Sequence, residues 1–225
     1  MRLTSLFLLL ALCLPAAPTH AVLPTYDEPV RNLYLIRHGE YEHDVDTADE
    51  GGLVLLGRQQ ARLIAARLDA MPVDFTALRA STMTRARETA EIIAPRFPEL
   101  EIDLRDDIRE CTPTTRRRDI MERQLPGDPE ACEATLAAAW ERLAVPATGD
   151  ADEHEVVVCH GNVIRWFVCQ ALQVDPQAWL GMSIANCSLT IIQIRRDGSA
   201  KVICFADSGH IPYGMTTYPG TPALD

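Results

Sequence analysis

A short apolar run that stops at Arg37-His38-Gly39 restricts the possible folds of this chain more than any other feature. Residues 33–36 are apolar, and an apolar run that breaks at glycine is typical of a buried strand ending in a tight turn. One Arg-His-Gly occurs by chance, and a histidine at a strand end is often only structural. The chain repeats the arrangement, however, because the apolar residues 156–159 precede His160-Gly161. Two such units favour a site at the carboxyl ends of strands, where open α/β sheets bind ligands.

Strand and helix patterns alternate along the chain, which predicts an α/β fold with a mainly parallel sheet. We expect strands at residues 32–36, 75–80, 101–104 and 156–159, and a hairpin of residues 187–194 and 200–205. We expect helices at residues 55–68, 83–94, 131–143 and 162–172. Ser81 and Thr82 are good N-cap residues for the second of these helices. Residues 112–130 contain three prolines and are predicted to form an irregular excursion over the sheet edge.

Residues 1–21 have the pattern of a secretory signal peptide, with Arg2 before an apolar run and a small-residue cleavage site at Ala21. We predict a cleaved signal peptide and one domain over residues 22–225, in a protein that is exported to the periplasm or secreted. The apolar run is far shorter than the roughly 20 residues of a membrane span, so no stable span is expected after cleavage. The alternative is a membrane anchor, formed by an uncleaved segment or by lipidation of Cys13.

The formal net charge of −11 makes the chain a poor general binder of nucleic acid or anionic membranes. No nucleic-acid partner is expected, and any anionic ligand must be drawn to a local cationic pocket. The acidic residues at 44–50 lack the spacing of a calcium loop. We expect no metal site and no cofactor, and the sequence does not indicate the oligomeric state.

The seven cysteines include no Cys-x-x-Cys pair, which argues against a zinc knuckle or a thioredoxin-type motif. Cys111 and Cys132 flank a loop-rich stretch and are the candidate disulfide pair. The four later cysteines fall in predicted strands and a helix, where we expect small buried apolar residues.

Polar side chains follow four of the predicted strands. Arg37 and His38 follow the first strand, Arg85 follows the second by one helical turn, Glu110 follows the third, and His160 follows the fourth. If these strands are neighbours in a parallel sheet, their carboxyl ends converge and the five side chains share one site.

These residue types suit a phosphoryl group. Arginine presents a planar fork that matches phosphate oxygens. A neutral imidazole nitrogen can attack phosphorus when the other ring nitrogen is held as a donor. A carboxyl held protonated near the site, best placed at Glu110, can supply the proton that the leaving alkoxide needs.

Together, Arg37-His38-Gly39, Arg85, Glu110 and His160-Gly161 resemble the histidine phosphatase superfamily, and the resemblance extends over nearly all of residues 22–225. It implies a phosphoglycerate-mutase-like three-layer sandwich with a mainly parallel central sheet. It also implies that His38 is the nucleophile and Glu110 the proton donor. Arg37, Arg85 and His160 fall on the phosphate-pocket positions.

Residues 37–41, 81–86 and 159–165 resemble more closely a mitochondrial serine/threonine protein phosphatase of this superfamily, although Gly161 is an alanine there. Mutases of the superfamily usually have Ser or Thr where this chain has Tyr41, which favours a phosphatase. The predicted function is metal-independent hydrolysis of phosphomonoesters through a phosphohistidine, with phosphoserine and phosphothreonine proteins as candidate substrates. The alternatives are a small-molecule phosphatase or mutase of the same superfamily and a non-catalytic phosphate or phosphopeptide binder.

Other basic side chains are interpreted as structural. Arg165, one helical turn after His160, is expected to pair with a carboxylate, and contact with the phosphate is the alternative. Arg87 is expected to face away from Arg85, because residues two apart on a helix do not share a face. The basic run at residues 116–118 is interpreted as solvated.

Overall fold

The computed structural model describes residues 28–43 and 51–218 of the chain. Its centre is one sheet with the strand order β3-β2-β4-β1-β5-β6. The strands are β1 (Arg31–Arg37), β2 (Ala77–Ser81), β3 (Ile102–Arg105), β4 (Glu153–Cys159), β5 (Leu189–Ile194) and β6 (Ala200–Asp207). The helices are α1 (Leu55–Asp69), α2 (Thr84–Ile93), α3 (Arg118–Met121), α4 (Asp128–Leu143) and α5 (Gly161–Leu172). The predicted signal peptide, residues 1–21, lies outside the described residues.

The sheet is mainly parallel, as the sequence predicts. β1 and β2 both pair in parallel with β4, and β2 also pairs in parallel with β3. β5 runs antiparallel to β1 and forms the expected hairpin with β6. The carboxyl ends of β1, β2, β3 and β4 therefore lie along one edge of the sheet. This edge carries the predicted site residues.

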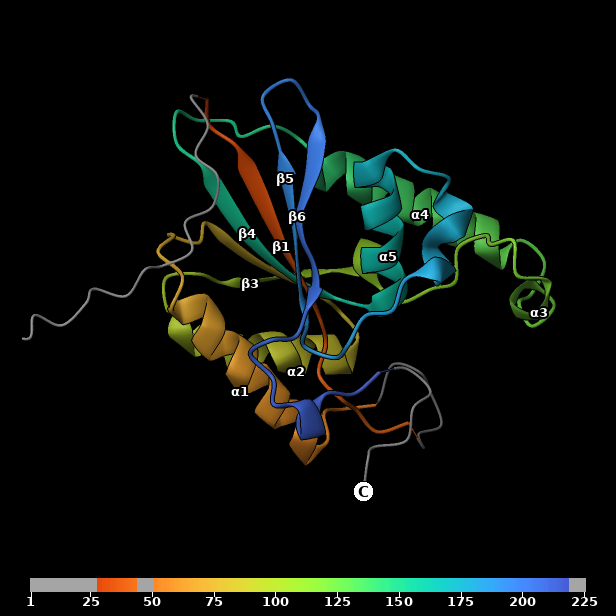
Figure 1. Cartoon of the computed structure of the whole chain (residues 1–225), viewed down its shortest axis with the longest axis horizontal. Coiled ribbons are helices and arrows are strands. Elements are labelled where there is room, and N and C mark those ends of the chain that lie inside the picture. Colours follow the sequence, from red (N-terminus) through yellow and green to blue (C-terminus); the bar gives the residue numbers. More distant parts are fainter. Residues whose placement is uncertain (1–27, 44–50, 219–225) are drawn as a thin grey trace, which may run out of the picture.

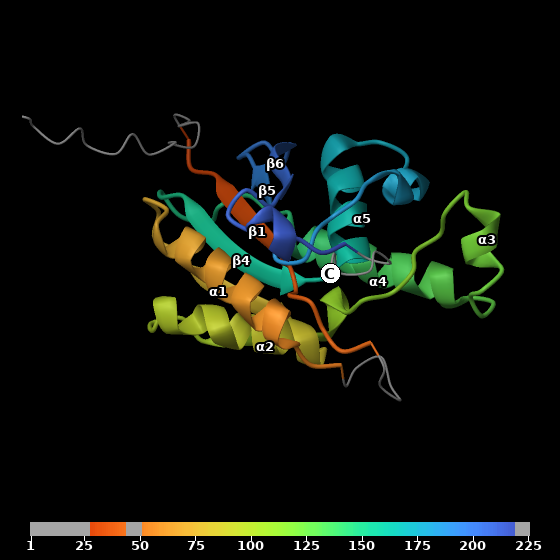
Figure 2. The same cartoon turned by 60° about the horizontal axis from the view of Figure 1, so that its bottom comes forward.

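Helices cover both faces of the sheet and give the predicted three-layer sandwich. Helices α1 and α2 lie on one face, and α4 and α5 lie on the other (Figures 1 and 2). Alternate residues of β1 serve the two layers, since side chains of a strand point to opposite faces in turn. Tyr34 and Ile36 join the core under α1 and α2, while Leu33 and Leu35 join the core under α4 and α5. Each of these buried side chains stabilises the sheet by roughly 1.5–3 kcal/mol.

One predicted N-cap and one predicted helix start are wrong. Helix α2 begins at Thr84 with Met83 as its N-cap, and no side chain caps it; Ser81 instead ends β2. Helix α4 begins three residues earlier than predicted, at Asp128, because Gly127 turns the chain with a left-handed φ of 89°. Pro129 is tolerated in the first turn, where a backbone N–H has no partner within the helix.

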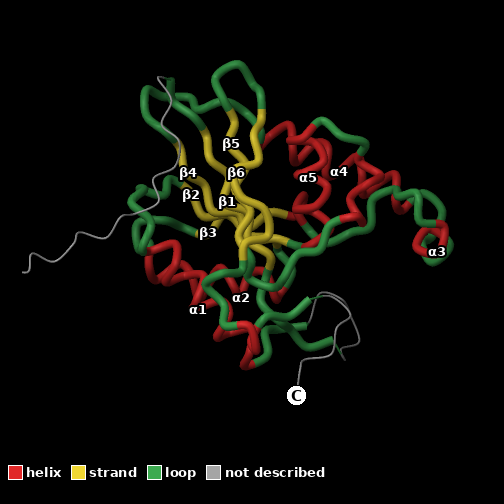
Figure 3. Tube along the Cα trace, in the orientation of Figure 1, coloured by secondary structure: helices red, strands yellow, loops and turns green. Residues whose placement is uncertain are grey.

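The excursion between β3 and α4 is mostly loop, with the single turn of α3 at its far end (Figure 3). A disulfide joins Cys111 to Cys132 and confirms the predicted pair. Cys159, Cys169 and Cys187 are buried thiols and Cys204 is half-buried, in line with their expected packing role. Within the described part of the chain, no helix has the length and apolar character needed to cross a membrane.

Candidate active site

The carboxyl ends of the parallel strands enclose a cavity of about 140 Å³. It is lined by Arg37, His38, Tyr41, Arg85, Glu110, Gly161, Asn162 and Arg165. The fifth predicted site residue, His160, lies beside the cavity with its ring centroid 5.1 Å from that of His38. The fold thus brings together all five side chains that the sequence singled out.

Hydrogen bonds fix which nitrogen of His38 faces the cavity. Its Nδ1 lies 2.8 Å from the carbonyl oxygen of Gly39. A carbonyl oxygen only accepts, so Nδ1 carries the proton and donates. Nε2 is left with its lone pair, and the Nε–H of Arg85 donates to it across 3.2 Å. The Asn186 amide also donates to the backbone carbonyl of His38, at 3.0 Å, and anchors that residue.

The surroundings of His38 keep its imidazole neutral. Complete burial lowers its pKa well below the usual value, and the neighbouring His160, Arg37 and Arg85 lower it further. Burial disfavours the charged form of a histidine, and nearby positive charges add to that effect. His38 therefore presents an unprotonated Nε2 to the cavity at neutral pH.

Gly39 permits the close approach that holds His38. A Cβ on Gly39 would lie 2.6 Å from the carbonyl oxygen of Gly57, at the start of α1. The Gly39 N–H donates to the Thr89 hydroxyl on α2, at 3.1 Å. The turn is thus clamped between two helices, which explains why glycine follows the histidine.

His160 is fully buried, and Ser81 fixes its ring. Its Nε2 lies 2.8 Å from the Ser81 Oγ, which accepts the backbone N–H of Met83, and a hydroxyl that donates its own hydrogen to Nε2 leaves the ring proton on Nδ1. We therefore assign the ring proton to Nδ1, which lies 3.9 Å from a carboxyl oxygen of Glu110. Burial, followed by the charges of Arg85 and Arg37, lowers the pKa of His160 well below its usual value.

Arg37 and Arg85 make the cavity cationic although the chain as a whole is acidic. Arg37 is 6% exposed; its Nη1 donates to the Ile184 carbonyl, and its buried Nε has no hydrogen-bond partner among the described residues. Arg85 is 4% exposed, and its guanidinium stacks 4.6 Å from the ring centre of Tyr41. Buried charges and polar atoms are costly unless paired. The arrangement therefore favours an anion in the cavity.

Glu110 approaches the cavity from the loop after β3. Its side chain is 27% exposed, but its Oε2 is buried and has no hydrogen-bond partner within the described structure. Burial raises the pKa of this carboxyl, partly opposed by Arg37, Arg165 and Arg85. A carboxyl with a raised pKa holds a proton more readily, which suits a proton donor.

Four lining residues are not among the five predicted side chains: Tyr41, Gly161, Asn162 and Arg165. Tyr41 contacts both the His38 ring, at 5.1 Å between centroids, and Arg85. Arg165 donates to two backbone carbonyls and to the Asn162 side chain, at 2.6 Å. The predicted pairing of Arg165 with a carboxylate is therefore wrong. The signal that could have found Asn162 and Arg165 is their position in the first turns of the helix that follows His160.

The remaining basic residues lie outside the cavity. Arg87 is 44% exposed and pairs with Glu91 at 3.5 Å, so it faces away from Arg85 as predicted. Two arginines of the 116–118 run pair with aspartates on the surface, Arg116 with Asp175 and Arg117 with Asp119. This placement agrees with a solvated basic run.

Comparison with known proteins decides the family. The model of the histidine phosphatase superfamily (branch 1) matches residues 33–206. The chain belongs to this superfamily. All five predicted site residues lie within the matched range, and so do the carboxyl ends of the strands that carry them.

Curated relatives of this histidine phosphatase carry protein phosphatase names. It is 41% identical over 189 residues to the mitochondrial serine/threonine-protein phosphatase Pgam5 of Caenorhabditis elegans and 34% identical over 189 residues to PGAM5 of Homo sapiens. Each match covers 81% of this chain and 64% of the relative. The chain thus spans just under two thirds of the length of these relatives.

Solved structures share the fold. Phosphoglycerate mutase from Plasmodium falciparum is 26% identical, with a TM-score of 0.59 over 82% of this chain and 96% of that one. Bacillus stearothermophilus YhfR is 23% identical, with a TM-score of 0.66 over 81% of this chain and 100% of that one. Phosphoserine phosphatase from Entamoeba histolytica is 22% identical, with a TM-score of 0.64 and the same coverage. The phosphoglycerate-mutase-like fold is thereby confirmed.

The comparisons correct the predicted location. The relatives with protein phosphatase names are mitochondrial proteins, which contradicts export to the periplasm or secretion. The prediction rested on the apolar pattern of residues 1–21. A basic residue followed by a short apolar run indicates a targeting segment, but it does not by itself specify the compartment.

Proposed function

We propose that this histidine phosphatase is a phosphoric monoester hydrolase that forms a phosphohistidine at His38 and acts on phosphoserine and phosphothreonine proteins. The observation that carries the proposal is the unprotonated Nε2 of His38, which faces a buried cationic cavity beside Glu110. The superfamily membership supports this activity.

In the first step, the substrate phosphate binds the guanidinium groups of Arg37 and Arg85 and the Nδ1–H of His160. The Nε2 lone pair of His38 attacks phosphorus, and the bond from phosphorus to the leaving oxygen breaks. Glu110 donates its proton to that oxygen, so the product leaves as an alcohol. The bound arginines stabilise the charge that develops on the phosphoryl oxygens.

In the second step, a water molecule replaces the alcohol. The Glu110 carboxylate accepts a proton from this water while its oxygen attacks phosphorus, and the bond to Nε2 breaks. His38 returns to its neutral form, Glu110 is protonated again, and inorganic phosphate is released. One carboxyl thus acts as acid and then as base, and the reaction consumes one water for each phosphate formed.

Glu110 also argues against the alternative of a non-catalytic phosphate binder. A carboxyl next to two buried arginines weakens the attraction of their charges for an anion, so binding alone gains nothing from it. Its raised pKa instead matches a group that must give up a proton during the reaction.

The substrate class rests on the relatives, which are named serine/threonine-protein phosphatases. Tyr41 supports a phosphatase over a mutase, since it fills the position beside His38 where mutases of the superfamily usually have Ser or Thr. Small phosphomonoesters are the competing substrate class. A panel of phosphopeptides and small phosphoesters, compared by kcat/KM, separates the two classes.

The test of the mechanism is the phosphoenzyme. Acid-labile, base-stable label should accumulate on the wild-type enzyme after mixing with labelled substrate, and His38→Ala should abolish both the label and the turnover. Arg87→Ala is the matched control, because Arg87 lies on the same helix as Arg85 but faces solvent. If His38→Ala retains most of the turnover of p-nitrophenyl phosphate, the proposed mechanism is wrong.

A further inference from the structure

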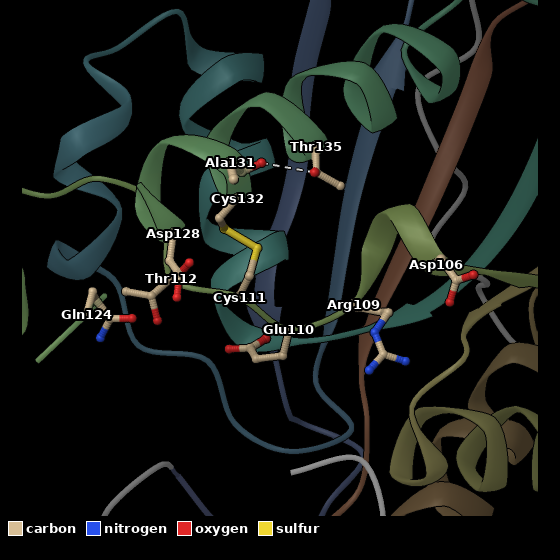
Figure 4. Close-up of a pocket in the computed structure, with 10 residues that line it drawn as sticks. All are labelled: Asp106, Arg109, Glu110, Cys111, Thr112, Gln124, Asp128, Ala131, Cys132 and Thr135. Carbon is tan, nitrogen blue, oxygen red and sulfur yellow. Dashed lines mark hydrogen bonds between the residues drawn. A yellow bond between two sulfur atoms is a disulfide. The ribbon is translucent and has the colours of Figure 1, made fainter. Parts of the chain in front are cut away.

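The disulfide between Cys111 and Cys132 lies directly beside the proton donor, and the mechanism above does not use it. Cys111 follows Glu110 in the chain, and Cys132 lies in the first half of α4 (Figure 4). Cys132 is 7% exposed and belongs to the core packed under α4 and α5, together with Leu136 and Ala139. The disulfide therefore attaches the Glu110 loop to a rigid part of the molecule.

At Glu110 and Cys111 themselves, the other restraints on this loop are a few side-chain contacts. In the part of the chain that the structure describes, the backbone of residues 110–116 forms no hydrogen bond with other backbone groups. The Glu110 N–H contacts the sulfur of Met83 at 3.3 Å, and the Glu110 carboxyl accepts the Asn162 N–H at 3.4 Å. A thioether sulfur is a weak acceptor, and the 3.4 Å contact is longer than the usual N–H to oxygen hydrogen bond. The Asn162 side chain donates to the Cys111 carbonyl at 2.8 Å. Further along the loop, the Thr114 hydroxyl donates to the Glu133 carboxylate on α4, and the Trp179 indole N–H donates to the Thr114 carbonyl at 3.0 Å.

We propose that the Cys111–Cys132 disulfide positions Glu110 for proton donation, and that reduction by a small dithiol withdraws this carboxyl from the leaving group. The proposal rests on the proposed function, because it assumes that Glu110 donates a proton. It adds a redox-dependent positioning element to the site. Of the residues that line the phosphate pocket, only Glu110 comes from this loop; Arg37, Arg85 and His38 come from other elements.

A reductant can reach the disulfide through a second cavity. This cavity has a volume of about 440 Å³ and lies between the loop and α4 (Figure 4). Glu110, Cys111, Cys132 and Thr135 are among its lining residues. The cavity shares only Glu110 with the phosphate pocket, so a reductant can enter without occupying the phosphate site.

The reduction follows ordinary thiol–disulfide exchange. A thiolate of the dithiol attacks one sulfur, the protein S–S bond breaks, and a mixed disulfide forms while the other cysteine takes up a proton. The second thiol of the reductant then displaces the remaining cysteine, which is also protonated. Two electrons and two protons pass to the protein, and the reductant leaves as a cyclic disulfide.

Two substrates that differ in their need for a proton distinguish a loss of proton donation by Glu110 from a general disruption of the active site. p-Nitrophenyl phosphate has a leaving group that departs without a proton, whereas phenyl phosphate releases a more basic oxygen and needs one. The two substrates are otherwise nearly the same size. A misplaced Glu110 should therefore lower kcat/KM for phenyl phosphate and spare p-nitrophenyl phosphate.

The experiment compares kcat/KM for both substrates before and after reduction with dithiothreitol. We expect a fall of about 10- to 100-fold for phenyl phosphate and a change of less than about threefold for p-nitrophenyl phosphate. The double variant C111S/C132S should have the kcat/KM values of the reduced enzyme for both substrates, and dithiothreitol should not change them. Cys204→Ser is the matched control and should respond to dithiothreitol as the wild type does, since Cys204 is a half-buried free thiol away from the cavity.

Glu110→Gln provides the coupling test. Without an ionisable carboxyl at this position, reduction should cause no further loss with phenyl phosphate. Equal losses for both substrates would assign the disulfide a merely structural role and overturn the proposal, as would no loss for either. If the oxidised wild type turns over neither substrate, the proposed function fails and this inference fails with it.

Discussion

The Nε–H of Arg85 donates a hydrogen bond to Nε2 of His38 across 3.2 Å. Because Nδ1 carries the ring proton and donates it to the carbonyl of Gly39, the acceptor in this contact is the lone pair of Nε2. An arginine remains charged at all accessible pH values, so it opposes protonation of the nitrogen that it touches. The same guanidinium also lines the anion cavity. Arg85 thus links the state of the nucleophile to the binding of phosphate.

The first prediction concerns this double role. Arg85→Lys keeps the positive charge but loses the planar fork and the stacking on Tyr41. We expect kcat/KM for p-nitrophenyl phosphate to fall by about 10- to 100-fold, which corresponds to the roughly 1.5–3 kcal/mol of a hydrogen bond to a charged group. Arg87→Lys, on the exposed side of α2, should stay within twofold of wild type, roughly the scatter of a surface substitution. Equal activity of Arg85→Lys and wild type would exclude the double role.

The second prediction concerns pH. The free enzyme is active when His38 is neutral and Glu110 is protonated. On the acid limb, activity rises as His38 loses its proton, and the lowered pKa of His38 places this rise below the usual histidine range. On the alkaline limb, activity falls as Glu110 loses its proton, and the raised pKa of Glu110 places this fall above the usual glutamate range. We expect a bell-shaped profile of kcat/KM with an optimum on the acid side of neutrality.

Glu110→Gln isolates the alkaline limb of that profile. The variant cannot lose a proton at this position, so the decline at higher pH should disappear for phenyl phosphate, at a lower overall kcat/KM. Ionisation of the substrate phosphate near pH 6 is common to both enzymes and cancels in their ratio. An alkaline limb that is unchanged in Glu110→Gln would assign the decline to another group.

The parts of the site that the sequence predicts are those set by local signals. His38 and His160 each follow an apolar run that ends at glycine, and this pattern alone places them at strand ends. The ends then come together because the parallel strands β2, β4 and β1 are neighbours in the sheet. The position of β4 between β1 and β2 is not readable from these signals, because it depends on packing between distant segments.

The parts that the sequence misses depend on distant partners. Arg165 was expected to meet a carboxylate, but its donors reach the carbonyls of Gly161 and Met182. The position of Met182 depends on the path of the chain after α5, and the sequence there has no apolar periodicity from which that path could be predicted. Ser81 was interpreted as a helix cap, whereas its hydroxyl is occupied by His160 from another strand. When a side chain can bond either to a local group or to a distant one, the sequence alone does not show which partner it takes.

The third prediction concerns Ser81. Ser81→Ala removes the group that fixes Nε2 of His160, so the imidazole can adopt the other tautomer and present a lone pair to the phosphate. We expect kcat/KM to fall about tenfold and the free energy of unfolding to fall by roughly 1–3 kcal/mol, the cost of a buried unsatisfied polar group. Steady-state kinetics and urea denaturation measure the two effects. Ser199→Ala, in the β5–β6 turn, should change neither, and an unaffected Ser81→Ala would show that His160 needs no fixed tautomer.

The fourth prediction concerns Gly39. In Gly39→Ala, the added methyl group would lie 2.6 Å from the carbonyl oxygen of Gly57, and a backbone atom cannot move aside without shifting α1. We expect the free energy of unfolding to fall by roughly 1–3 kcal/mol, and kcat/KM to fall because the Gly39 carbonyl orients His38. Gly181→Ala is the matched control, since a Cβ there meets no atom of the described structure within 4 Å. Urea denaturation and p-nitrophenyl phosphate kinetics test both variants. A Gly39→Ala enzyme as stable and active as Gly181→Ala would mean that the turn after β1 relaxes freely and does not orient the nucleophile.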